Sequence, residues 1–288
     1  MRFRRLLIGL LCLAGLAVLL DFGVAAYSEY RVSRLLRTGS DLSADPEITF
    51  HESIGHPFVI QALDGKYSSV DVRARVLRPD IPGQITVEAN LRGTRVSMRN
   101  LIDGNVGRVP VDEVLSRVRI EPAELGRMFN IQGLQVFGPP TDKSDGSGGS
   151  GGTGVTTTGA VILEGFVPVT PDTDPALSVQ IPDQRGDGGE KITTKKVHVL
   201  AELKLEGNQV QVTATAISGR DLQGDADTEP TVIPEQDRAA VLARFTHTID
   251  IKNMPFGIMP TKVEAIGGQI VVEGTARNVT VDLDRLQS

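Results

Sequence analysis

The chain has 288 residues and a formal net charge of −6, and hydrophobic residues make up 40% of it. A mildly acidic chain lacks the basic surface that nucleic-acid recognition requires, so nucleic acid is excluded as a partner. Tryptophan is absent and aromatic residues make up only 4%, so the core must be built mainly from valine, isoleucine and leucine.

The N-terminus has the features of an export segment. Three arginines within the first five residues precede an uncharged run from Leu6 to Leu20, an arrangement that keeps the N-terminus in the cytoplasm while the run enters the membrane. The run is short for a span of about 20 residues, although extending it to Ala26 reaches spanning length. Small residues at Val24-Ala25-Ala26 suit a signal peptidase.

Two fates of this segment stay open. Residues 1–26 are either a signal peptide cleaved after Ala26, or an anchor in which residues 6–26 hold the protein at the outer face of the cytoplasmic membrane. In both cases the sequence predicts a protein exported to the cell envelope or periplasmic space. Because this segment holds three arginines and one aspartate, the remainder carries a formal charge of −8.

Motifs for catalysis and metal binding are missing from the sequence. The one cysteine, Cys12, lies in the export segment, so the exported part has no disulfide and no cysteine metal site. The four histidines have no metal-ligand spacing, and neither HExxH nor GxSxG occurs. The sequence therefore predicts a protein that is not an enzyme and that carries no metal or cofactor.

After the export segment, the spacing of Val32, Leu35 and Leu36 predicts a helix over 27–38, within a helical connector over 27–47. Most of the remaining chain alternates apolar and polar residues, as in the stretches 69–76 and 84–91, which is typical of antiparallel strands with one buried face. Glu206-Gly207-Asn208 predicts a hairpin turn between two such strands.

Three segments have helical patterns. Glu121–Phe129 has Pro122 in its first turn, Pro234–Phe245 has an apolar stripe after an acidic first turn, and Val96–Ile102 predicts a short helix. We expect these helices to cover the concave face of a curved sheet. Gly138–Gly159 is rich in glycine and serine and is interpreted as a flexible insertion within a single domain over 48–288.

Two segments together carry a resemblance to a known family. Gly55–Ala74 has a G-x-P-F motif, an apolar turn, a G-x-Y motif and an alternating strand. Asn253–Leu283 has a Pro-Phe-Gly turn, a strand, a Gly-Gly pair and a final amphipathic strand. With the exported N-terminus, this order over Ile48–Leu283 resembles the LmeA-like phospholipid-binding domain family of actinobacteria.

The resemblance implies an α+β fold in which a long curved antiparallel sheet wraps around a few helices, as in the tubular lipid-binding, BPI-like domains. It also implies a partner that is a phospholipid or another acyl-chain lipid, and a role in lipomannan and lipoarabinomannan synthesis, with envelope glycosyltransferases as further partners. The predicted function is therefore phospholipid binding, with lipid transfer as a further option. The alternative is a scaffold or chaperone-like partner of envelope enzymes that carries no lipid.

The physical basis of lipid binding would be an apolar groove that the helices only partly fill. Burying an acyl chain in it gains about 0.8 kcal/mol for each methylene. The alternative for each candidate is that it simply packs in the core. The candidate lining residues are Phe58, Ile60, Leu63, Leu125, Phe129, Leu242, Phe245, Phe256 and Ile258. A further hypothesis is that Phe58 and Phe256, each preceded by proline, meet at one end of the molecule and dip into a membrane.

Overall fold

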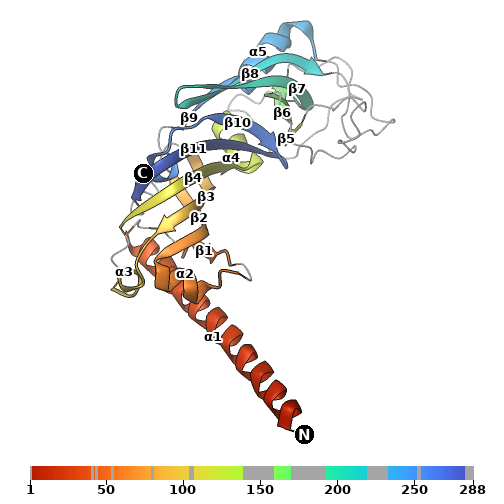
Figure 1. Cartoon of the computed structure of the whole chain (residues 1–288). Helices are drawn as coiled ribbons and strands as arrows, with labels where there is room; N and C mark the ends of the chain where they lie inside the picture. Colours follow the sequence, from red (N-terminus) through yellow and green to blue (C-terminus); the bar gives the residue numbers. More distant parts are fainter. Residues whose placement is uncertain are drawn as a thin grey trace.

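The structure of the chain is a computed structural model. It describes residues 2–39, 42, 45–52, 55–78, 81–103, 107–138, 159–169, 193–218, 233–251 and 254–282. Figure 1 shows a long helix, α1 (Arg2–Gly39), that projects from one end of a body built of two sheets. Residues 139–158, and with them nearly all of the predicted glycine- and serine-rich insertion, lie outside the described ranges.

The first sheet is antiparallel and has six strands within the described ranges, in the spatial order β1-β2-β3-β4-β11-β10. It is strongly curled, in the manner of a half-barrel. Its strands are β1 (Glu47–Phe50), β2 (Lys66–Arg78), β3 (Ile81–Arg95), β4 (Arg108–Ile120), β10 (Lys262–Ile266) and β11 (Gln269–Asp282).

The second sheet is also antiparallel, with five strands in the order β5-β6-β7-β8-β9 over the same ranges. Its strands are β5 (Gln132–Phe137), β6 (Ala160–Val169), β7 (Thr193–Glu206), β8 (Gln209–Ser218) and β9 (His247–Asp250). The predicted turn at Glu206-Gly207-Asn208 joins β7 to β8, and Gly207 adopts the left-handed backbone conformation with φ of 58°. The hairpin prediction is therefore confirmed.

The alternating pattern identified the buried face of the strands correctly. In β2 the side chains of Val70, Val72 and Val76 are buried, and in β3 those of Ile85 and Leu91 are buried. Register pairs Val70 with Leu91 and Val76 with Ile85, so the two apolar rows lie on the same face of the sheet.

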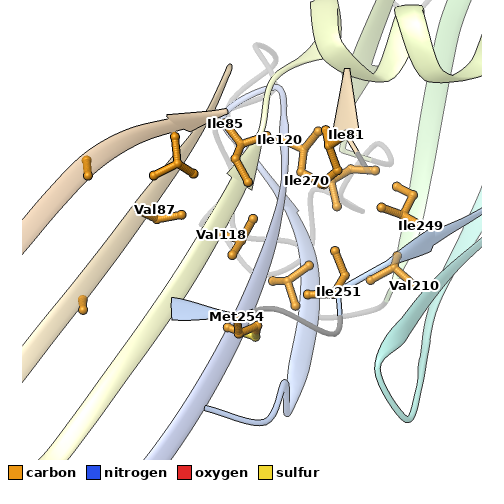
Figure 2. Close-up of a cluster of buried hydrophobic side chains, with 14 of the residues drawn as sticks. Ile81, Ile85, Val87, Val118, Ile120, Val210, Ile249, Ile251, Met254 and Ile270 are labelled. Atoms are coloured by element: carbon orange, nitrogen blue, oxygen red, sulfur yellow. The ribbon is translucent and has the colours of Figure 1, made fainter. Parts of the chain in front are cut away.

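The expectation of one long sheet is wrong, because the strands divide between two sheets that pack on each other. After β4 the chain forms α4 (Pro122–Phe129) and turns at Asn130, whose φ of 52° is left-handed, so β5 starts a new sheet. Figure 2 shows the shared core, where side chains of both sheets meet: Ile81, Ile85, Val118, Ile120 and Ile270 from the first, and Val210 and Ile249 from the second.

The predicted helices are present within one or two residues of the expected bounds. They are α3 (Met98–Asp103), α4 and α5 (Glu235–Phe245), and a 3-10 turn, η2, covers Pro255–Gly257. α4 packs against β5 and β3, and α5 packs mainly against β8. The apolar turn expected after Pro57 is instead a helix, α2 (Phe58–Asp64), which packs against α1 and β2.

Candidate functional site

α1 has two parts with different surroundings. The apolar side chains described between Leu7 and Phe22 are exposed to solvent in the free chain, and this helix is long and apolar enough to cross a membrane. From Asp21 onwards one stripe of the same helix packs on the body, at the helical spacing of Ala25, Val32 and Leu36, which are all buried. A signal peptide and a membrane anchor are both compatible with such a helix.

Asp21 connects the two parts of α1 to the body. Its carboxylate accepts hydrogen bonds from the backbone N–H groups of Phe58 and Val59, at 3.1 Å and 2.7 Å. These groups open α2, whose own N-cap residue, Pro57, makes no side-chain cap. Asp21 therefore caps α2 from a distance of 37 residues along the chain, satisfying donors that a helix start leaves unpaired.

Further polar contacts fix α1 against the first strand. The Glu29 carboxylate accepts a hydrogen bond from the Phe50 N–H at 2.9 Å, and the Ser33 hydroxyl donates to the Pro46 carbonyl at 2.6 Å. Burial and the neighbouring Asp21 carboxylate raise the pKa of Glu52 above its ordinary value. The helix is thus joined to the body by specific hydrogen bonds as well as by apolar packing.

An apolar groove lies where α1, α2 and α3 meet, and we call it the helix groove. Its volume is about 180 Å³ and its walls are mostly apolar, with Ser28 and Arg31 as the polar contributors. The other lining residues are Val24, Tyr27 and Val32 from α1, Phe58 and Ala62 from α2, and Met98 and Leu101 from α3. Such a surface suits hydrocarbon better than a polar ligand.

A smaller cavity of about 40 Å³, the inner cavity, adjoins the helix groove and lies between α1 and the buried face of the six-stranded sheet. The two share Val32 and Leu101 in their linings. The inner cavity is lined further by Leu36, Ile48, Phe50, Tyr67, Val70, Val72, Leu91, Thr94, Val96 and Val109. The two hollows therefore lie close together, one between the helices and the other against the sheet.

Tyr67 is the unusual member of the inner cavity. Its side chain is only 2% exposed, and its hydroxyl has no hydrogen-bond partner among the described residues. The ring packs against Phe50 and Phe58, with centroids 5.1 Å and 5.8 Å away. Burial raises the pKa of Tyr67 to about 12. A buried hydroxyl without a partner costs free energy, so Tyr67 destabilises the fold relative to an apolar ring of the same shape.

We expect Tyr67→Phe to stabilise the free chain by about 1 kcal/mol, because it removes a buried donor that has no partner. In the wild type, stability should fall as pH rises from 10 towards 12, since the unfolded tyrosine ionises while the folded one stays protonated. Denaturant unfolding at pH 8 and at pH 11 measures both effects. A variant that is less stable at pH 8 would show that the hydroxyl has a partner.

The same substitution provides a spectroscopic signature. An ionised tyrosine absorbs ultraviolet light at a longer wavelength than a neutral one. The chain has three tyrosines, so subtracting the titration of the variant from that of the wild type isolates the ionisation of Tyr67. The difference should be a single step near pH 12. A difference step near the ordinary value of about 10 would place Tyr67 in contact with water instead.

A larger hollow of about 290 Å³ lies on the opposite face of the six-stranded sheet, and it is charged. Asp71 and Arg73 line it, alternating with the buried valines of β2. Its charges are paired across strands, as in the contact between Arg119 and Glu88 at 2.8 Å and that between Arg117 and Glu273 at 2.6 Å. Mutual pairing makes this a ladder of surface ion pairs, each of small net value.

Asp71 belongs to the same ladder and lies 2.6 Å from the ring of His51. Burial tends to raise the pKa of the Asp71 carboxyl, but hydrogen bonds from Asn90 and His51 outweigh it and hold that pKa below its usual range. A second ionic cluster lies on the five-stranded sheet, where the buried Glu164 carboxylate contacts both His198 and Lys196. No residue of either cluster lines the helix groove or the inner cavity.

The nine residues proposed from sequence are placed very differently by the fold. Phe58 alone among them lines the helix groove. Ile60 and Leu63 are exposed on α2, and Leu242 is half-buried on α5. Five are buried in the core: Leu125, Phe129, Phe245, Phe256 and Ile258. Contact of these other residues with lipid stays a prediction.

The hypothesis that Phe58 and Phe256 dip into a membrane is wrong, because both side chains are buried. Phe58 packs in the aromatic cluster beside α1, and Phe256 lies in η2 against β3 and β4. The residues that sequence reasoning missed are those contributed by α1 and α3, above all Val24, Met98 and Leu101. The helical spacing of Val32 and Leu36 indicates that one face of α1 is buried, but it does not identify the groove residues on α3.

Metal binding has little support in the part of the chain that the structure describes, where no group of three or more His, Cys, Asp or Glu side chains could hold an ion.

Comparison with curated proteins gives no match, and comparison with solved structures gives none either. The expected likeness to tubular lipid-binding domains therefore stays a prediction.

The model of a family described as LmeA-like phospholipid-binding matches residues 19–275. This range begins within α1, two residues before Asp21, and ends within β11. It includes the other strands of both sheets and every residue that lines the helix groove or the inner cavity. Because the match covers most of its length, the chain belongs to the LmeA-like phospholipid-binding family.

Proposed function

We propose that this protein binds a phospholipid through one acyl chain, which enters the helix groove and extends towards the inner cavity. The observation that carries the proposal is the pair of mostly apolar hollows, which share two lining residues and together make the path that the acyl chain would follow. Family membership supports phospholipid as the ligand and a binding role in place of catalysis.

The size of the path limits how much lipid it accommodates. A cavity on the order of 150 Å³ holds one benzene molecule, and sites for drug-sized ligands measure about 300–1,000 Å³. The helix groove and inner cavity are about 180 Å³ and 40 Å³. In this conformation they accept part of one acyl chain, so the headgroup and the second chain of the lipid lie outside the protein.

We further propose that α1 is retained as an anchor and that the protein acts at its own membrane. Cleavage after Ala26 would remove the Asp21 cap of α2, the buried Ala25 and the groove residue Val24. An anchored protein at the outer face of the cytoplasmic membrane suits support of lipoglycan synthesis by envelope glycosyltransferases. It suits long-distance lipid transfer less well.

The test is mass spectrometry of lipids that co-purify with the full chain, extracted in polymer nanodiscs and then exchanged into lipid-free detergent. We expect about one phospholipid for each protein chain after exchange. The comparison protein carries Leu101→Trp. Leu101 lines both the groove and the cavity, so the larger apolar side chain should block the site. Equal lipid content in the two proteins, or lipid in neither, would contradict the proposed site.

A further inference from the structure

α2 has two apolar faces although it is only seven residues long. Phe58 and Ala62 are buried and line the helix groove. Ile60 and Leu63 lie three positions apart, on a different face, and their side chains are 46% and 74% exposed. Two large aliphatic side chains side by side on one exposed helix face are unfavourable in water, so this face requires an explanation.

The hydrogen bonds from α2 to Asp21 determine where this face lies along α1. The uncharged run of α1 ends at Leu20, and the next residue, Asp21, accepts the first N–H groups of α2. With α1 in a bilayer, α2 therefore lies at the level where the hydrocarbon ends. Figure 1 shows α2 beside α1 at the end of the body from which α1 projects.

One exposed aromatic side chain on α1, Phe22, lies at the same level, next to Asp21. Tyr27 and Tyr30 are also exposed, roughly 9 to 14 Å further along the helix towards the body. Aromatic residues, tyrosine and tryptophan above all, are enriched where a protein crosses the boundary between lipid and water. The exposed apolar surface of α1 thus continues beyond the uncharged run, to the end of the body at which α2 lies.

We propose that α2 docks into the interface of the bilayer leaflet from which the body emerges, with Ile60 and Leu63 inserted among the lipids. This would be a second membrane contact beside α1, held in place by Asp21. A protein partner fits less well, because a stable interface needs about 800 Å² from each partner and the exposed face of α2 offers only two large side chains. The continuity with α1 identifies the bilayer as the occupant.

The docking also determines where the helix groove opens. One face of α2 contacts lipid while Phe58 and Ala62, on its other face, form a wall of the groove. The mouth of the groove then lies at the bilayer surface, and a lipid would enter sideways from the leaflet without crossing water. The docking rests on the proposed retention of α1, and this consequence rests on the proposed lipid binding as well.

The experiment uses the full chain in phosphatidylcholine vesicles. Cys12 is the only cysteine, so Cys12→Ser gives a background in which Leu63→Cys or Met259→Cys carries one environment-sensitive fluorophore. Met259 is the control because it is also exposed but lies next to β10, in the body. We expect lipids spin-labelled near the headgroup to quench the probe at 63 strongly, and iodide in the water to quench it several-fold less than the probe at 259.

Equal quenching of the two positions by iodide would overturn the docking. A probe at 63 that neither iodide nor spin-labelled lipid quenches would also overturn it, in favour of a protein partner such as a second copy of the chain. Lipid analysis of the same samples separates the two proposals. Lipid retained without insertion contradicts only the docking, and insertion without bound lipid contradicts only the proposed function.

Discussion

Met98→Asp is expected to lower the lipid content of the purified chain about tenfold. Met98 is half-buried at the start of α3 and lines the helix groove, so the new carboxylate would face the acyl chain. A charge that loses water costs several kcal/mol, and the open side of the groove and Arg31 in its wall reduce this to roughly 1.4 kcal/mol, a factor of ten in affinity. Quantitative lipid mass spectrometry and competition with a fluorescent fatty acid measure the change.

The substitution should leave the fold intact, because an acidic residue in the first turn of a helix is favourable. Met259→Asp is the matched control, since it introduces the same charge at an exposed methionine outside the groove. It should retain wild-type lipid content. If both variants lose lipid equally, net charge is responsible and the groove is not the binding site. If neither loses lipid, the acyl chain binds elsewhere.

Asp21→Ala should release α2 from α1. The variant loses a carboxylate that accepts two backbone hydrogen bonds, and loss of a helix cap alone costs about 1 kcal/mol. Hydrogen bonds to a charged group are worth more, so we expect the amides of Phe58 and Val59 to exchange with deuterium at least tenfold faster, which corresponds to about 1.4 kcal/mol. Hydrogen exchange on the full chain in nanodiscs measures this at α2.

Asp45→Ala is the control for this prediction. Asp45 forms an exposed ion pair with Arg37 of α1 at 3.1 Å. Exposed ion pairs contribute little to the free energy of unfolding. Exchange at α2 should be unchanged in that variant, while Asp21→Asn, which keeps one acceptor oxygen, should give an intermediate rate. Unchanged exchange in Asp21→Ala would mean that α2 is held by packing alone, and the docking level inferred above would lose its basis.

The helices and strands could be predicted from the sequence because they depend on the pattern of neighbouring residues. Alternation in β2 and β3 identified which side chains are buried, and Pro122 identified the start of α4. The same alternation carries no information on which strand pairs with which. A strand has the same alternating sequence pattern in either sheet, so the division into two sheets at the turn around Asn130 could not be predicted.

The site was harder to predict, because it is formed by contacts between distant segments. α2 has no side-chain cap from its own neighbours, since its cap, Asp21, lies in α1, and so the segment after Pro57 looked like a turn. The groove is assembled from α1, α2 and α3, of which α1 contributes five lining residues and the two short helices contribute two each. Sequence reasoning placed apolar candidates throughout the core, and Phe58 is the one that this geometry brings into the groove.

The continuity of α1 has a mechanical consequence. With α1 retained, there is no joint between span and body, because one helix runs from the uncharged run into the stripe that packs on the sheet. From Leu20 to Leu36 it rises about 24 Å, at 1.5 Å per residue. The body therefore cannot move independently of the span. Its height above the membrane is fixed, and it tilts only when the span tilts. An enzyme partner of the kind proposed above would have to meet the body in the plane of the membrane.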